Sequence, residues 1–182
     1  MDKQKMLRQE AEEILQRLKL FPLLRKYGEA HVVGSVVLEL IVKLDLDIHL
    51  LLSSEALMES MNHITTELLD TPEIREVRIS DYRPSGVKIG IDECLAPSGN
   101  WTIDIWLTTD RATTAFDHAE RILSQLTPEK RKIILALKEH YHKRGKLRDG
   151  ISSVIYKAVL NGVRNVEEFE ISSPYLEYEQ SN

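Results

Sequence analysis

The sequence has 182 residues, 42% of them hydrophobic and 29% charged, and a formal net charge of −5 at pH 7. These values are ordinary for a folded globular protein and exclude one that coats nucleic acid by bulk positive charge, although a local basic patch stays open. The single cysteine, Cys94, cannot form an internal disulfide, and the first residues lack the apolar core of a signal peptide. No uncharged apolar run is long enough to span a membrane, so we expect a cytoplasmic protein with no membrane partner.

Apolar periodicity divides the N-terminal part into helices and strands. It predicts helices over 3–20, 35–43 and 54–69, with Ser54 as the N-cap of the third. Strands are predicted over 30–33, 45–52, 74–81, 86–94 and 101–108. The turn-rich residues Leu-Ala-Pro-Ser-Gly-Asn between the last two strands predict a β-hairpin.

From residue 113 onward the pattern becomes helical. Thr127 and Pro128 form a good helix start, with threonine at the N-cap and proline at the first helical position. We therefore predict a core over 1–112 and a C-terminal helical part over 113–182 packed on it. The predicted helices cover 113–125, 128–144, 150–162 and 166–170.

Each of three predicted strands has one aliphatic and one polar face, because side chains alternate along a strand. A sheet covered by helices on its aliphatic side would collect the polar residues on its open side. The polar faces hold Asp45, Asp47 and His49 in one strand, Lys88, Gly90, Asp92 and Cys94 in the next, and Thr102, Asp104 and Trp106 in the last.

The carboxylates on these faces suggest a metal site. Asp45 and Asp47 are two positions apart, so their side chains can converge on one ion, and Asp104 on an adjacent strand could complete the site. Such hard oxygen ligands suit Mg²⁺ or Mn²⁺, which retain water and bind substrate phosphates. Zinc does not fit a chain with one cysteine and no histidine pair at ligand spacing.

A Gly-Ser pair precedes the acidic strand. Gly34 and Ser35 lie between a predicted strand and a short predicted helix, which places backbone N–H groups and a hydroxyl where a phosphate can bind. Glycine also allows the phosphate to approach the backbone closely. The alternative for all of these residues is an ordinary amphipathic strand with a solvated face.

These residues together resemble the nucleotidyltransferase-fold superfamily, which includes DNA polymerase beta and small bacterial nucleotidyltransferases. Val33-Gly34-Ser35 is followed by nine residues, then by Asp45-Leu46-Asp47-Ile48, and Asp104 matches the third carboxylate of that pattern. The stretch 31–48 is also similar to the GrpB-like branch. The resemblance implies an α+β fold: a mixed β-sheet flanked by helices, with a helical C-terminal part.

The resemblance also implies roles for individual residues. Gly34 and Ser35 would bind the terminal phosphates of a nucleoside triphosphate, and Asp45 and Asp47 would bind Mg²⁺ or Mn²⁺. Asp104 would bind a second metal ion or act as the base for the acceptor hydroxyl. The Ala-Arg-Gly run of many small members is absent after the Gly-Ser pair, so Lys88 or Lys43 would replace its arginine at the phosphates.

Several other residues have structural alternatives that we prefer. His49 fits a partly buried, hydrogen-bonded histidine, Trp106 fits simple packing, and Cys94 has no identifiable activating neighbour. The basic run over 130–148 fits a solvated helix surface better than a path for RNA.

We therefore expect magnesium-dependent transfer of a nucleoside monophosphate from a nucleoside triphosphate to a hydroxyl of an acceptor. A small-molecule acceptor is slightly favoured over nucleic acid, because the chain is short and acidic. Two alternatives stay open: a nucleotide-binding protein on the same fold with weak or no catalysis, and a toxin-antitoxin component that modifies a macromolecule. The sequence does not specify the base, the acceptor or the oligomeric state.

Overall fold

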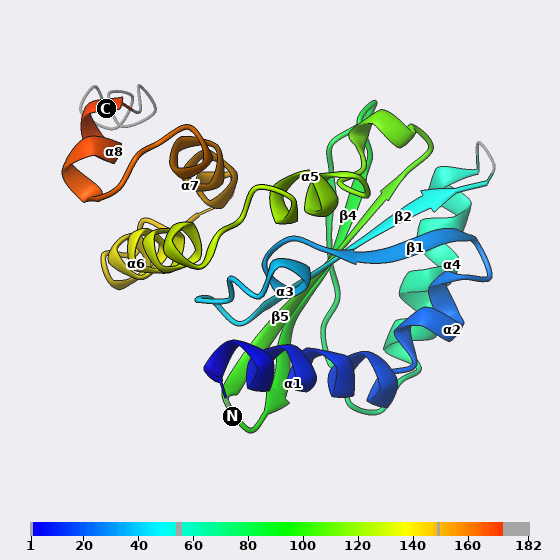
Figure 1. Ribbon diagram of the computed structural model, residues 1–182. Helices are drawn as coiled ribbons and strands as arrows, with labels where there is room; N and C mark the ends of the chain where they lie inside the picture. The colour runs from blue at the N-terminus through cyan, green and yellow to red at the C-terminus, as the bar shows by residue number, and fades with distance from the viewer. Residues whose placement is uncertain (1, 54–55, 149, 173–182) are drawn as a thin grey trace. The chain divides into compact units, whose positions relative to one another are not determined.

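The computed structural model describes residues 2–53, 56–148 and 150–172. The chain divides into two compact units, Met1–Ala119 and Glu120–Asn182 (Figure 1). We expected the helical part to begin at residue 113, whereas the division falls inside helix α5 (His118–Leu123).

The first unit contains a five-stranded mixed sheet with strand order β1-β2-β5-β4-β3. Strands β2 and β5 are parallel, and the other neighbouring pairs are antiparallel. This arrangement confirms the predicted α+β class with a mixed sheet. The strands are β1 (Gly28–Val33), β2 (Asp45–Leu52), β3 (Arg78–Asp81), β4 (Val87–Ala96) and β5 (Gly99–Thr108). The helices of this unit before α5 are α1 (Lys3–Arg17), α2 (Leu20–Leu24), α3 (Ser35–Leu38) and α4 (Leu57–Leu69), and a 3-10 turn η1 covers Arg111–Thr113.

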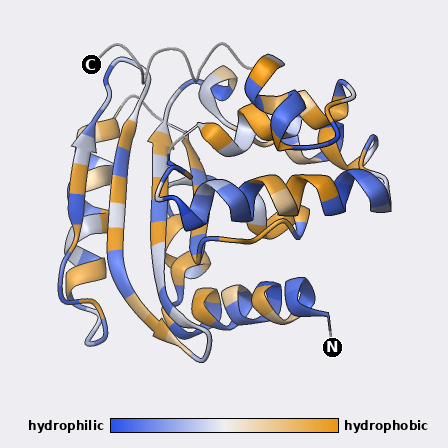
Figure 2. Ribbon diagram, turned by 90° about the vertical axis from the view of Figure 1, so that its left-hand side faces the viewer, coloured by the Kyte–Doolittle hydropathy of each residue, from blue (hydrophilic) through white to orange (hydrophobic). Residues whose placement is uncertain are grey.

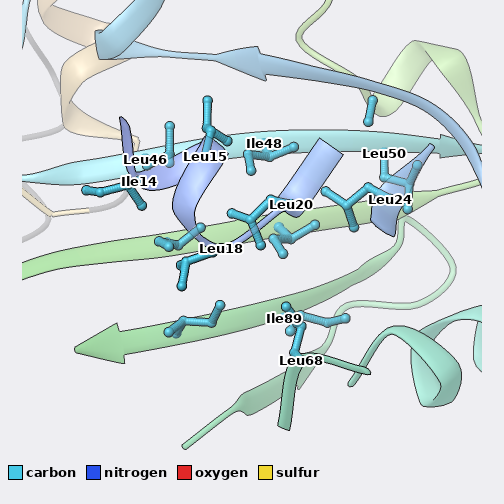
Figure 3. Packing of buried hydrophobic residues seen from close by; sticks show 14 of the residues in the cluster. Ile14, Leu15, Leu18, Leu20, Leu24, Leu46, Ile48, Leu50, Leu68 and Ile89 are labelled. Atoms are coloured by element: carbon cyan, nitrogen blue, oxygen red, sulfur yellow. The ribbon is translucent and has the colours of Figure 1, made fainter. Parts of the chain in front are cut away.

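Alternating side chains give the sheet one aliphatic and one polar face, as predicted. Figure 2 shows hydrophobic and hydrophilic residues alternating along the strands. The aliphatic face is buried under α1, α2 and α4, whose leucine and isoleucine side chains meet those of the strands (Figure 3). Burial of these side chains is the main stabilising contribution to this unit. The core includes Ile14, Leu20, Leu24 and Leu68 from the helices and Leu46, Ile48, Leu50, Ile89 and Ile105 from the strands.

The predicted helix over 3–20 is wrong at its C-terminal end. Helix α1 stops at Arg17, the backbone of Lys19 is left-handed with φ +51°, and the separate helix α2 follows. Pro22 lies in the first turn of α2, where the missing N–H would have no helical partner, so it does not break the helix.

Three further boundaries differ from those predicted. Helix α3 ends at Leu38 because Glu39 is left-handed, and the predicted helix over 113–125 is interrupted at Thr114, which is extended. Only 78–81 of the predicted strand 74–81 pairs with a neighbour. Ser54 lies outside the described residues, and the described part of α4 begins at Leu57 with Ala56 as its N-cap.

The placement of Cys94 on the polar face is also wrong. The pairing of β4 with β5 is irregular between Ile91 and Cys94, and this bulge shifts the alternation by one residue. Cys94 is therefore buried with the aliphatic side chains, beside its partner Trp101. The guanidinium of Arg17 donates to Cys94 Sγ at 3.2 Å, so the cysteine does have a cationic neighbour. Burial nevertheless raises the pKa of the thiol above its ordinary value, which keeps it protonated and unreactive.

The second unit is helical. It contains α6 (Pro128–Lys143), α7 (Ile151–Leu160) and α8 (Val166–Ser172), and the predicted N-cap of α6 is confirmed because the Thr127 side chain accepts from the N–H of Lys130. Across the described residues, no helix has both the length and the apolar character needed to cross a membrane.

A buried glutamate ties α1 to the β4–β5 hairpin. Glu10 is 6% exposed, and its two carboxylate oxygens accept from the N–H of Ser98 at 2.7 Å and from Trp101 Nε1 at 3.1 Å. Glu10→Ala would leave the buried Nε1 of Trp101 without an acceptor and would remove the hydrogen bond from the exposed Ser98, so we expect a loss of about 1 to 3 kcal/mol in the free energy of unfolding. Urea titration should detect this loss, whereas the exposed Glu13→Ala should stay within about 0.5 kcal/mol of the parent. A Glu10→Ala variant as stable as the Glu13→Ala control would contradict the assignment.

Candidate active site

The turn between β1 and α3 lies directly against the acidic strand. Gly34 has φ +70° and ψ −144°, a conformation that residues with a side chain rarely adopt. A Cβ atom at Gly34 would lie 2.6 Å from Asp47 Oδ2, because Val33 is the cross-strand partner of Asp47. Both the backbone and the neighbouring carboxylate therefore require glycine at this position.

Ser35 connects the same turn to the other aspartate of β2. Its hydroxyl donates to Asp45 Oδ1 at 3.4 Å, and Lys43 Nζ lies 3.7 Å from Asp45 Oδ2. The loop before β2 is held to α1 by Gln4, whose side-chain amide donates to the carbonyl of Ile41 at 2.9 Å and accepts from its N–H at 2.7 Å. These contacts bring the Gly-Ser turn and both aspartates of β2 together.

Asp104 lies next to Asp47 across the parallel pair β2–β5. Adjacent strands are about 4.8 Å apart, and both residues belong to the polar face, so the two carboxylates are neighbours. Lys88 on β4 donates to Asp104 Oδ2 at 3.1 Å, with side-chain exposures of 21% and 32%. The six site residues predicted from the sequence thus lie in one region of the sheet, and their roles remain predictions.

Sequence reasoning missed one residue of this region. Arg78 on β3 is the partner of Gly90, and Gly90 is the partner of Asp104, so these three residues form one row across the sheet. A Cβ at Gly90 would lie 3.4 Å from Asp104 Oδ1 and 3.7 Å from Arg78 Nη2, which places the guanidinium and the carboxylate on either side of this glycine. Arg78 also forms an ion pair with Asp92. The alternation over 74–81 could have placed Arg78 on a strand face, but not in this row.

The donor set fits a magnesium ion held partly by its substrate. Asp45, Asp47 and the Ser35 hydroxyl supply hard oxygen atoms, whereas Asp104 is paired with Lys88. Within the described ranges, no group of three or more His, Cys, Asp or Glu side chains is close enough to hold a metal ion together. Magnesium commonly uses one or two carboxylates together with water and substrate phosphates, so two aspartates are a sufficient protein contribution.

His49 is a partly buried, hydrogen-bonded histidine, which is the role that we preferred from the sequence. Its Nδ1 accepts from the N–H of Ala115 at 3.0 Å, which holds the segment after β5 over the polar face. Burial lowers the pKa of His49 from 6.5 to about 4, so the ring is neutral at pH 7 and Nδ1 is free of a proton.

The lowered pKa of His49 predicts acid destabilisation. Between pH 6.5 and 4 the unfolded chain binds a proton at His49 that the folded chain does not, so stability is complete above pH 6.5 and falls as the pH decreases toward 4. We expect a loss of about 2 kcal/mol by pH 4.5, less than the full shift would give because the ring is partly exposed. Urea titrations at pH 7.5, 5.5 and 4.5 should show a smaller pH dependence for His49→Gln than for the parent. Equal pH dependence in the two proteins would contradict the assignment.

Another cavity lies elsewhere in the first unit. It has a volume of about 890 Å³, and its lining includes Arg17, Glu73, Arg75 and Cys94 but none of the predicted site residues. Its charges are mixed, and it contains no glycine turn beside a carboxylate.

The sheet order and the acidic polar face define the nucleotidyltransferase fold, and solved structures confirm it. The chain is similar to the Cid1 poly(U) polymerase bound to MgATP, with a TM-score of 0.59 and 19% identity over 79% of this chain and 45% of that chain. It is also similar to the polymerase core of TRAMP, an RNA surveillance complex (TM-score 0.57, 19% identity, 98% of this chain and 53% of that chain). The structure of the GLD-2/RNP-8 complex matches with a TM-score of 0.54 and 16% identity over 93% of this chain and 61% of that one.

These similarities establish the fold. The chain spans 45% to 61% of the length of the three solved structures it matches here. No protein-family model matches the sequence, and no significant match was found among curated proteins.

Proposed function

We propose that this chain is a magnesium-dependent nucleotidyltransferase that transfers a nucleoside monophosphate from a nucleoside triphosphate to a terminal hydroxyl of RNA. The observation that carries the proposal is the contact of the Gly34–Ser35 turn with Asp45 and Asp47, next to Asp104 on the adjacent parallel strand. A glycine turn and strand carboxylates at one place combine a phosphate site with a cation site. The solved structures with MgATP and MgGTP bound to the Cid1 poly(U) polymerase support this chemistry.

In this proposal the Gly34–Ser35 turn binds the terminal phosphates. Gly34 has no side chain to block their approach, and the hydroxyl of Ser35 is a donor next to the cation ligand Asp45. Lys43, 3.7 Å from Asp45, adds positive charge on this side of the site. These residues would hold the leaving pyrophosphate end of the nucleotide.

Asp45 and Asp47 would hold the magnesium ion. When bound, the ion neutralises the charge that develops on the α-phosphate and on the leaving pyrophosphate. Without a cation, the neighbouring carboxylates of Asp47 and Asp104 repel each other, and Lys88 offsets this repulsion at Asp104. Lys88, which pairs with Asp104 in this structure, would be placed to bind a phosphate oxygen when Asp104 holds a cation.

Asp104 would act on the acceptor. It lies on the side of Asp47 away from β1 and the Gly-Ser turn, because β5 follows β2 in the sheet order. In-line displacement places the attacking hydroxyl opposite the leaving group, so the acceptor would approach from the Asp104 side. There Asp104 would accept the hydroxyl proton or contribute to a second cation.

We propose RNA as the acceptor, in place of the small molecule slightly favoured by the sequence. The names of the similar structures support this choice, since they describe a poly(U) polymerase and the polymerase core of an RNA surveillance complex. The second unit also supplies local positive charge despite the net charge of −5. Its exposed cations over 130–148 include Lys132, Lys143, Arg144, Lys146 and Arg148, whereas Lys138 is buried.

Transfer to a labelled RNA oligonucleotide tests the proposal directly. The protein is incubated with the RNA, Mg²⁺ and each of the four ribonucleoside triphosphates, and the products are separated by length. We expect extension with at least one triphosphate, loss of extension with EDTA, and loss in the Asp47→Asn variant. A protein that binds triphosphate with Mg²⁺ but extends no RNA would contradict the proposed acceptor.

A nucleotide-binding protein with weak or no catalysis is the second candidate. The ion pair between Lys88 and Asp104 favours it, because a carboxylate neutralised by lysine is a poor base and a poor metal ligand. The two candidates differ in what Asp104→Asn does: an enzyme should lose turnover and keep nucleotide affinity, whereas a binding protein has no turnover to lose. For either candidate we propose a reducing, cytoplasmic setting, consistent with one buried cysteine.

A further inference from the structure

Two aromatic side chains lie on the polar face next to the candidate active site. Trp106 follows Asp104 by two residues on β5, so both side chains belong to the same face of the sheet. Tyr82, in the turn between β3 and β4, is 50% exposed, and its ring centroid lies 5.7 Å from that of Trp106. We call Tyr82 and Trp106 the aromatic shelf.

The shelf is held in place from several directions. A Cβ at Gly86 would lie 2.6 Å from Cζ2 of Trp106, so the turn before β4 closes tightly against the indole ring. The backbone N–H of Tyr82 donates to the carbonyl of Gly86 at 3.0 Å, and Thr108 donates to the carbonyl of Ser85 at 3.0 Å. The two rings are tilted by 46° to each other, so a base would stack on one ring at a time. A ring that is already held in place loses little conformational entropy when a ligand stacks on it.

Packing alone does not account well for a tryptophan at this position. Trp106 Nε1 is buried, and no hydrogen-bond acceptor reaches it within the described part of the chain. Burying an unpaired N–H is unfavourable, and an aliphatic side chain would avoid that cost. Trp101, by contrast, is fully buried and donates its N–H to Glu10. Unlike Trp101, Trp106 has a partly exposed ring, and this ring lies beside Asp104.

The position of the shelf points to the acceptor side of the site. Trp106 is the cross-strand partner of Lys88, and Lys88 binds Asp104. The Gly34–Ser35 turn lies beyond β2, on the other side of Asp104 in the sheet order. Two residues along a strand span about 6.6 Å, so the shelf lies roughly one nucleotide away from the Asp104 carboxylate.

We propose that the terminal base of the RNA acceptor stacks on the aromatic shelf, which positions its hydroxyl at Asp104. This inference rests on the proposed function and adds to it a binding site for the acceptor base. Stacking accepts every base, because each has a π-face, so the shelf would bind the RNA end without reading its sequence. Lys88, next to Trp106, would face the backbone phosphate of that end.

The test compares the loss of the ring with the loss of the base. RNA affinity is measured by fluorescence anisotropy for an oligonucleotide and for the same oligonucleotide with an abasic terminal nucleotide. Trp106→Leu should weaken binding of the intact RNA about 5- to 100-fold and should not weaken binding of the abasic RNA further. Trp106→Phe should restore most of the affinity, and Tyr82→Leu should give a smaller loss of the same kind. Retained Trp101 fluorescence and far-UV dichroism show that each variant is folded.

The outcomes separate this inference from the proposed function. Equal losses on intact and abasic RNA, or a rise in the KM for the triphosphate in place of the RNA, would overturn the aromatic shelf while leaving RNA extension intact. If Trp106→Leu loses affinity for the intact RNA but not for the abasic RNA, and the protein extends no RNA, the aromatic shelf would be supported and the proposed reaction overturned. Failure to bind the oligonucleotide at all would overturn both.

Discussion

The Asp45→Asn/Asp47→Asn protein should no longer bind nucleoside triphosphate in a magnesium-dependent way. The two carboxylates lie at the Gly34–Ser35 turn, and replacing both removes the negative charge that would hold the cation beside the terminal phosphates. We expect the Kd for the triphosphate in the presence of Mg²⁺ to rise about 100-fold or more, since several charged contacts are lost together. Calorimetric titration with each of the four triphosphates, with and without Mg²⁺, measures this change.

A matched control separates a loss of the site from a change in overall charge. Asp70→Asn/Asp117→Asn removes the same two charges at exposed positions outside the candidate active site. This protein should bind triphosphate as the parent does. If the Asp45→Asn/Asp47→Asn protein binds as tightly as the control in the presence of Mg²⁺, the assignment of the cation site is wrong.

Gly34→Ala should damage both the stability and the nucleotide site. The added methyl group would lie 2.6 Å from Asp47 Oδ2, and the backbone at φ +70°, ψ −144° is strained for any residue with a side chain. We expect a loss of about 2 to 4 kcal/mol in the free energy of unfolding, together with a loss of triphosphate binding as the Asp47 carboxylate is displaced. Urea titration and calorimetry measure the two effects.

Gly145 offers a control for the effect of the backbone. It has φ +67°, but a Cβ there would have no atom within 4 Å among the described residues, so Gly145→Ala should cost only about 1 kcal/mol. The clash itself is tested with Asp47→Ala, which removes the carboxylate. In that background Gly34→Ala should be less destabilising than in the parent, because the two side chains no longer meet. Purely additive effects of the two substitutions would show that the close approach does not contribute.

Much of the site was accessible to sequence reasoning, because local patterns determine side-chain direction. The alternation over 45–52 correctly predicts β2 and places Asp45 and Asp47 on its polar face. The same argument holds for Asp104 in β5, and the Gly-Ser pair was correctly placed between a strand and a short helix. In each case the neighbouring residues along the chain carry the information.

Irregularities within a helix or strand were harder to predict from the sequence. The bulge in β4 shifts Cys94 to the aliphatic face, and the left-handed backbone at Lys19 divides the first predicted helix. Neither position carries glycine, proline or another residue that would mark it in the sequence. A pattern of hydrophobic and polar residues predicts side-chain direction within a regular element, so it contains neither irregularity.

Strand order was decided by the tertiary structure alone. The parallel pairing of β2 with β5 makes Asp47 and Asp104 neighbours, and the pairing of β1 with β2 presses Gly34 against Asp47. Arg78 lies in the same row of the sheet as Asp104 only because β3 pairs with β4. The sequence by itself determined which side chains share a face of each strand, since that depends on the backbone of the strand. Which faces meet, and in what register, depends on how distant segments pack together, and only the folded chain decides it.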